Sequence, residues 1–311
     1  MVKRDGEILD VPYEISILAE SGGRQAGSLA GKAVSVMEKR FKLLQPDRGE
    51  IGRLNEDRTL TDLNPEVARV LLFADSMRQL TNGMYDYRFG ALRNLWEITE
   101  EEPKPPSPAE LEAALAKCRD LRLTVEGSRA SLSGEGPIDL GDVAAGWAVD
   151  GAAETLIKGG VGCAIIRFGN VTRLWGVRDD TIRWRMDFAP PPGDSTWYVL
   201  TPPDGAFCSY GKGINGFQYL GTYYPRLLDP RDGMPSDSAI TVASYAPDAA
   251  SAGALAPALF VMGKRIAFQW LNANDKYGIF IVHRIGAQRQ RVAETSFSLL
   301  DCLTDSTATE E

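Results

Sequence analysis

Strand-like and helix-like patterns are mixed along this chain without the regular β-α-β alternation that builds a parallel sheet. A strand-like run at residues 13–18 is followed, at residues 29–44, by apolar side chains at helical spacing. The second half of the chain is richer in strand patterns and turns. We therefore predict an α+β fold, in which two closely joined lobes are built around mixed or antiparallel sheets with flanking helices.

Several predicted helices begin at recognisable capping residues. Asn64 precedes a proline, which is typical of a cap followed by the first helical residue, and Ser107 begins a capping box. Asp248 is placed to cap a further helix over residues 249–263. Pro257 lies inside that helix, where a proline removes a backbone hydrogen bond, so we expect a kink there.

Length and composition are those of an ordinary globular protein. The 311 residues suffice for one large domain, and 44% of them are apolar, so a packed core is expected. We predict a single domain over residues 1–305, followed by a polar, disordered tail at residues 306–311. The formal net charge of −8 argues against a non-specific nucleic-acid binder, because such proteins need a basic face.

Neither the cysteines nor the histidine forms a recognisable metal motif. The four cysteines are far apart and include no C-x-x-C pair, so we expect free thiols rather than disulfides or a zinc site. The single histidine, His283, ends an apolar run at residues 278–283 that is typical of a buried strand. A structural role is therefore favoured for His283 over a catalytic triad or a multi-histidine metal site.

The sequence contains no apolar stretch long enough to span a membrane. Its first residues lack the apolar core and the cleavage site of an export signal. We therefore expect a cytoplasmic protein. The alternative is a periplasmic or membrane-anchored protein from which an export signal has been removed.

One candidate functional segment is residues 139–146 (DLGDVAAG), which combine a strand end, a glycine turn and a helix start. Backbone N–H groups at such a helix start can bind phosphate, although small residues before a helix more often serve packing. Asp142 is expected to cap this helix, and the alternative role is that of a metal ligand.

Two other segments are ambiguous from their residues alone. Residues 226–233 (RLLDPRDG) hold two arginines and two aspartates, which could bind a phosphate or form a salt-bridged turn, and the spacing alone favours the salt-bridged turn. Residues 80–88 (LTNGMYDYR) place two tyrosines after a helix end. Those rings could stack on a planar ligand or belong to the core.

The order of these segments resembles the FAD:protein FMN transferase family, also known as the ApbE family, over roughly residues 9–285. The family's strongest signature, DLGGIAKGYAVD, is similar to residues 139–150, which read DLGDVAAGWAVD. Asn55 stands where the family has an asparagine at a helix end. Four more motifs resemble the family in the family's order, at residues 81–86 (TNGMYD), 90–96 (GALRNLW), 226–233 and 252–259 (AGALAPAL).

The resemblance implies a protein that binds FAD and a divalent metal, usually magnesium, in a cleft between the two lobes. Such proteins transfer the FMN half of FAD onto a threonine hydroxyl of a partner flavoprotein and release AMP, and some members instead hydrolyse FAD to FMN and AMP. The resemblance implies two catalytic residues, Arg226 and Asp229. It implies these cofactor-binding residues: Asn55, Tyr85, Asp86, Asp139, Gly141, Ala144, Ser209 and Asp229.

The sequence departs from the family pattern where the metal is expected. Gly253 and Pro257 replace the metal-binding aspartate and threonine, so only the backbone carbonyl of Ala144 carries over as a ligand. Because magnesium prefers charged oxygen ligands, its binding is expected to weaken unless Asp142 or Asp248 substitutes. Two further departures are Ala145 for the signature lysine and Arg226 for a histidine.

Three functional hypotheses follow from the match and the departures. The first is a flavin transferase or FAD pyrophosphatase, in which Arg226 contacts phosphate as a fixed charge. The second is a catalytically inactive protein that still binds FAD or FMN. The third is a structural or partner-binding protein without a ligand.

Overall fold

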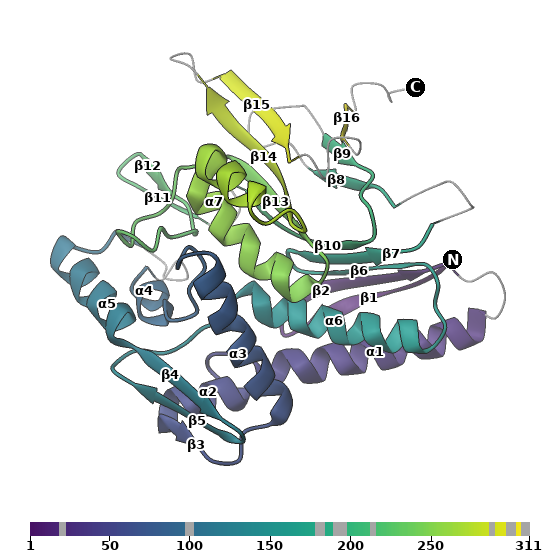
Figure 1. The fold of residues 1–311 in the computed structure, drawn as a ribbon, viewed down its shortest axis with the longest axis horizontal. Coiled ribbons are helices and arrows are strands. Elements are labelled where there is room, and N and C mark those ends of the chain that lie inside the picture. The colour runs from purple at the N-terminus through teal and green to yellow at the C-terminus, as the bar shows by residue number, and fades with distance from the viewer. Residues whose placement is uncertain are drawn as a thin grey trace.

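An eight-stranded antiparallel sheet forms the centre of the fold in this computed structural model, which describes residues 1–18, 23–96, 103–177, 184–188, 198–211, 216–285, 290–296 and 303–305 (Figure 1). From one edge to the other the strands are β1 (Val2–Ile8), β2 (Val11–Ile17), β6 (Ala164–Phe168), β7 (Val171–Trp175), β10 (Gly205–Gly211), β13 (Thr241–Ala246), β14 (Gly278–Ile285) and β15 (Gln290–Thr295). Every neighbouring pair in this sheet is antiparallel.

Three long helices pack side by side against this sheet: α1 (Gly23–Leu43), α6 (Asp142–Lys158) and α7 (Ala249–Asn272). In Figure 1, α6 lies between the other two. It is buried along most of its length, and its own buried residues are small or apolar, which lets the neighbouring helices pack closely. On the side of α1 that faces the sheet, the rings of Phe41 and Phe168 pack edge to face, with their centroids 4.7 Å apart.

A second group of elements lies beside this helix layer, at the lower left of Figure 1. It contains α2 (Gly49–Asp57), α3 (Pro65–Leu80), α4 (Gly90–Leu95), α5 (Pro108–Asp120) and a small sheet of β3 (Thr59–Leu60), β5 (Arg129–Ser133) and β4 (Arg122–Glu126). The remaining strands are the hairpin β11 (Phe217–Tyr219) and β12 (Thr222–Tyr224), and the sheet β16 (Leu303–Asp305), β9 (Tyr198–Leu200) and β8 (Met186–Phe188). One buried apolar cluster runs through both groups of elements.

The predicted α+β class, with antiparallel sheets and flanking helices, is confirmed. The capping signals were read correctly, because Asn64 accepts the N–H of Glu66 at 2.8 Å and Ser107 forms a full capping box at the start of α5. Asp248 caps α7 by accepting the N–H of Ser251 at 2.7 Å. These caps are local, so the sequence was enough to place them.

Two expectations about the elements were wrong. The sheet begins with β1, which precedes the first predicted strand and pairs with β2 through a turn at Leu9 and Asp10. In α7, helical φ and ψ angles continue through Pro257, and the interruption lies instead at Gly263, whose φ of 64° is in the left-handed region. Glycine adopts that conformation without steric cost, so the helical path breaks there.

Some predicted features fall at the ends or outside the described residues. Residues 304 and 305 of the polar end lie in β16, whereas residues 306–311 and Cys302 are outside the described part of the chain. No disulfide joins any cysteines among the described residues. In the same residues, no helix has the length and apolar character needed to cross a bilayer.

His283 is buried in β14, as predicted. Its Nε2 lies 2.7 Å from Oε1 of Glu294 on the neighbouring β15, and Lys264 of α7 contacts the same carboxylate.

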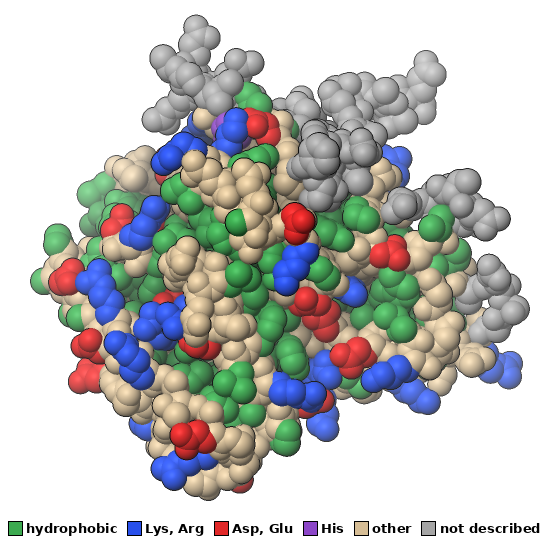
Figure 2. Space-filling model, in the orientation of Figure 1, with side chains coloured by type: hydrophobic (Ala, Val, Ile, Leu, Met, Phe, Trp, Pro, Cys, Tyr) green, Lys and Arg blue, Asp and Glu red, His purple; other side chains and the backbone are tan. Residues whose placement is uncertain are grey.

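On the face drawn in Figure 2, basic and acidic side chains are interspersed rather than gathered into an extended basic surface.

Candidate functional site

The start of α6 is the point at which the predicted segments meet. Gly141 is the N-cap of α6, with a φ of 57°, and no side chain caps the helix there. The Asp139 carboxylate accepts the N–H of Gly141 at 2.8 Å, while the backbone N–H of Asp139 donates to the carbonyl of Tyr87 at 2.7 Å. The signature segment is therefore held on one side by the segment that contains Tyr85 and Asp86.

Asn55 holds the same loop from the other side. Its Nδ2 donates to the carbonyl of Ile138 at 2.9 Å, and its Oδ1 accepts the N–H of Ile138 at 2.8 Å. Nδ2 also donates to the carbonyl of Pro46 at 2.9 Å. The amide of Asn55 is thus occupied by the chain itself, and it orients the residues leading to Asp139.

Arg93 of α4 forms an ion pair with Asp139. Burial opposes ionisation of Asp139, but the Arg93 guanidinium and the Gly141 N–H hold the pKa of this carboxyl below its ordinary value. A Cβ at position 141 would lie 2.9 Å from Nη2 of Arg93, so the guanidinium occupies the space above the glycine turn. The side chain of Arg93 is 40% exposed and that of Asp139 is 22% exposed, so a ligand can reach this pair.

Asp142 is the first residue of α6 and does not cap it, so the favoured prediction for this residue was wrong. The reason is that Gly141 occupies the N-cap position, and the backbone N–H of Gly141 donates to the Asp139 carboxylate. The Asp142 carboxyl instead accepts the hydroxyl of Tyr210, and the sulfur of Cys208 lies 3.7 Å from its Oδ2. Burial and then Asp142 raise the pKa values of both Cys208 and Tyr210, so thiol and phenol stay protonated.

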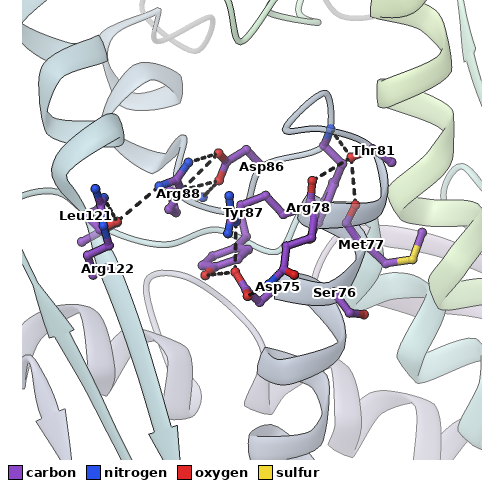
Figure 3. A network of polar contacts seen from close by, with 12 residues as sticks. Asp75, Ser76, Met77, Arg78, Thr81, Asp86, Tyr87, Arg88, Leu121 and Arg122 are labelled. Atoms are coloured by element: carbon purple, nitrogen blue, oxygen red, sulfur yellow. Dashed lines mark hydrogen bonds and ion pairs between the residues drawn. The ribbon is translucent and has the colours of Figure 1, made fainter.

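The side chains of Tyr85, Asp86 and Tyr87 are buried rather than open to a ligand. Tyr85 is 3% exposed, and its hydroxyl donates to the carbonyl of Leu140 at 3.2 Å. Figure 3 shows the buried carboxylate of Asp86 facing the guanidinium of Arg88, with Nη2 at 2.6 Å. Both Asp86 oxygens accept from Arg88, so Asp86 shapes the loop.

Asp229 repeats the geometry of Asp86 in the second candidate loop. Its carboxylate accepts the backbone N–H of Arg231 at 2.9 Å and the Nε of the same residue at 2.8 Å. The loop is attached to α4 because Nε1 of Trp96 donates to the carbonyl of Gly233 at 2.9 Å. The predicted salt-bridged turn is therefore present, but it uses only one of the two arginines.

Arg226 is the other arginine of that loop, and it is exposed. Within the described residues it makes no hydrogen bond or ion pair, yet its charge is close enough to help lower the pKa of Asp139. An unpaired guanidinium thus lies near the Arg93–Asp139 pair. Ser209 of β10 is half-buried; its backbone N–H donates to the carbonyl of Asn170 at 3.1 Å.

Asp248 lies beside the middle of α6, two turns along the helix from Asp142. The start of α7 is held there by Asp150 of α6, whose carboxylate accepts the N–H groups of Ala249 at 2.9 Å and Ala250 at 3.0 Å. Asp248 borders a hollow of about 460 Å³ between α3 and the start of α7. Ala144, in the first turn of α6, is buried.

The described residues contain no group of three or more His, Cys, Asp or Glu side chains arranged to hold a metal ion. At the predicted metal position, Gly253 and Pro257 offer no side-chain oxygen. The residues present therefore do not fit the magnesium site that the resemblance implies.

Comparison with known proteins shows the family to which the chain belongs. The ApbE family model matches residues 9–281 of the chain. The chain belongs to the ApbE family. A FAD:protein FMN transferase of Vibrio cholerae is 27% identical over 293 residues, which cover 90% of this chain and 87% of that protein. One of Treponema pallidum is 24% identical, covering 75% and 73%.

Solved structures share the fold. The flavin transferase ApbE from Vibrio cholerae superposes with a TM-score of 0.78 at 24% identity, covering 97% of this chain and 98% of that one. The apo flavinyl transferase ApbE of Pseudomonas stutzeri gives a TM-score of 0.82 at 20% identity, covering 95% and 94%. The expected fold is therefore that of solved ApbE proteins.

Sequence reasoning missed three residues of this ApbE-family site. Arg93, Cys208 and Tyr210 contact Asp139 or Asp142 from segments 46 to 68 residues away in the sequence. Arg93 stands inside the motif at residues 90–96, and a polar residue within that apolar run was the available signal.

Proposed function

We propose that this chain binds FAD against the start of α6 and acts as a flavin transferase, moving the FMN half of FAD onto a hydroxyl of an acceptor flavoprotein. Membership of the ApbE family supports the reaction class. The observation that carries the binding site is Arg226, an exposed guanidinium without a partner among the described residues, whose charge helps to lower the pKa of Asp139 in the Arg93–Asp139 ion pair. Such a guanidinium is suited to a phosphate oxygen because it presents a fixed fork of donors.

The other residues have supporting roles in this proposal. Four of the predicted residues position the loops, because their polar atoms form hydrogen bonds or ion pairs within the protein: Asn55, Tyr85, Asp86 and Asp229. Ser209 has no assigned contact with FAD, because strand alternation turns its side chain away from the face on which Cys208 and Tyr210 meet Asp142. Arg226 binds phosphate as a permanent cation, since an arginine does not accept a proton at neutral pH.

The transfer exchanges one phosphorus–oxygen bond for another. The acceptor hydroxyl oxygen bonds to the phosphorus of the FMN half, and the bond from that phosphorus to the bridging oxygen breaks. AMP leaves with the bridging oxygen, and the hydroxyl proton passes to solvent. Arg226 would stabilise the negative charge that moves onto the phosphate oxygens.

A second candidate function, FAD binding without turnover, is favoured by one specific observation. The positions from which the resemblance implies metal ligands are Gly253 and Pro257, and the signature lysine is Ala145. Each substitution removes a group that would interact with a charged phosphate or its counterion. Binding and turnover must therefore be measured separately.

The test is a titration of FAD followed by its fluorescence, with wild-type protein, Arg226→Ala and Arg129→Ala. Arg129 is an exposed arginine on β5 and serves as the matched control. We expect Arg226→Ala to weaken FAD binding about tenfold, as loss of a charge-assisted hydrogen bond would, and Arg129→Ala to leave it unchanged. Equal affinity in all three proteins would place FAD elsewhere, and no binding would favour the ligand-free hypothesis.

Chromatography of the incubated nucleotides separates the remaining hypotheses. Release of AMP together with a flavin mass increase on an acceptor protein supports the transferase. Release of both FMN and AMP identifies a pyrophosphatase, and intact FAD after binding identifies the inactive flavin binder.

A further inference from the structure

Helices α6 and α7 are in close backbone contact at the start of α6. Gly253 faces the backbone of Asp142 there, and a Cβ at position 253 would lie 2.6 Å from the carbonyl carbon of Asp142 and 3.1 Å from the amide nitrogen of Val143. Both contacts are with backbone, which cannot swing aside as a flexible side chain can. The junction is thus closed to any side chain at position 253, including one that carries a metal-binding oxygen.

The residues around this contact do not supply oxygen ligands by another route. Pro257, one turn further along α7, has no polar side-chain atom. Asp248 already accepts the N–H of Ser251 with one oxygen and its hydroxyl with the other. Both oxygens of Asp150 accept backbone N–H groups of α7.

The Asp142 carboxyl, beside the Gly253 contact, is directed to the sheet instead of to α7. Its Oδ2 accepts the Tyr210 hydroxyl and faces the Cys208 sulfur, both from β10. Cys208 is fully buried and Tyr210 is half-buried, so this contact lies inside the fold. Magnesium in proteins is usually held by one or two carboxylates together with waters and phosphate oxygens, and the carboxyl available here is already hydrogen-bonded to Tyr210.

We infer that the α6–α7 junction of this chain has lost its divalent-cation site, and that the hydrogen bond from Tyr210 to Asp142 fixes the start of α6 in place of a metal. On the proposed function, it follows that FAD binds without a divalent cation. The contact serves the positioning role by tying the helix start to β10 from inside the core. The site's positive charge then comes from arginine side chains alone.

The loss of the divalent-cation site is tested by titrating the protein with Mn²⁺ and measuring the free-ion signal by electron paramagnetic resonance, which falls when the ion binds. The full chain is used, with and without FAD. We expect the free Mn²⁺ signal to equal that of buffer, or of FAD alone. Stoichiometric binding of one ion per chain that Asp142→Asn weakens tenfold or more would overturn the inference.

The second part is tested by the dissociation constant of FAD in EDTA and in excess magnesium. We expect the two values to agree within about twofold. A tenfold tightening by magnesium would contradict the inference. If FAD binds in neither buffer, the proposed function fails, and the Mn²⁺ measurement on the FAD-free chain still decides whether the cation site exists.

The positioning role of Tyr210 has its own test. Tyr210→Phe should weaken FAD binding several-fold by the same factor in EDTA and in magnesium, while the exposed hairpin variant Tyr219→Phe leaves it unchanged. An unchanged affinity in a folded Tyr210→Phe protein would show that the contact does not position the site.

Discussion

Gly253 of α7 packs directly on the backbone of Asp142 at the start of α6, and the space between them admits no side chain. Gly253→Ala should therefore destabilise the protein by about 1–3 kcal/mol, because overpacking outweighs the gain in helix propensity. Denaturant unfolding monitored by circular dichroism measures the difference. Gly27→Ala is the matched control, because a Cβ there meets nothing within 4 Å in α1 and should stabilise by roughly 0.5–1 kcal/mol. A Gly253→Ala protein as stable as the control variant would show that the helices are not in close contact.

Tyr210→Phe removes the hydroxyl that the Asp142 carboxyl accepts. We expect a loss of about 1–3 kcal/mol in unfolding free energy, since a partly buried carboxyl loses its donor. Tyr219→Phe, in the exposed hairpin, should stay within roughly 0.5 kcal/mol of wild type. Equal stabilities of the two variants in urea unfolding would argue against the Tyr210–Asp142 contact.

The Asp86–Arg88 and Asp229–Arg231 pairs share one geometry but differ in burial. The side chains of Asp86 and Arg88 are 3% and 17% exposed, against 12% and 50% for Asp229 and Arg231. Asp86→Ala should cost about 3 kcal/mol or more because it leaves a buried arginine unpaired, while Asp229→Ala should cost nearer 1 kcal/mol because Arg231 can be hydrated. Thermal and urea unfolding of the two variants gives the comparison. The reverse order of the two losses would contradict it.

Asp150 makes the stability of the α6–α7 contact depend on pH. Burial raises the pKa of Asp150 to about 6, against the lowering effect of the N–H groups of Ala249 and Ala250, and Asp248 adds to the rise. The folded protein therefore binds a proton more tightly than the unfolded chain. The corresponding stability is present below pH 4 and is lost as pH rises to about 6.

Asp150→Asn removes this titration. Relative to wild type, the variant should gain stability as pH rises from 4 to 7, by on the order of 1–3 kcal/mol. Urea unfolding of both proteins across that range measures the difference, which cancels contributions from the other carboxyls. A difference that does not change with pH would show that Asp150 titrates normally in the folded state.

The sequence predicted the elements whose signals are local. Asn64 and Ser107 mark the starts of α3 and α5 because a cap bonds residues only two or three positions away. Strand β1 was missed because it is an edge strand with mostly exposed side chains, so it shows no alternation of apolar and polar residues. The break at Gly263 was assigned to Pro257, since a proline is the stronger general signal.

The candidate site was only partly predictable for the same reason. Motif order indicated Asp139 and Gly141, which the structure places at the start of α6, and Arg226, whose charge helps to lower the pKa of Asp139. Arg93 and Tyr210 reach that point from elements far away in the sequence, and no local pattern shows which partner each will meet. The orientation of Asp142 toward β10 likewise depends on packing between α6 and the sheet.

Equilibrium dialysis of the EDTA-treated wild-type chain against FAD tests the central claim most directly. The account predicts one bound FAD per chain, with an affinity that added magnesium does not change. Binding that appears only when magnesium is added, or no binding in either buffer, would contradict it.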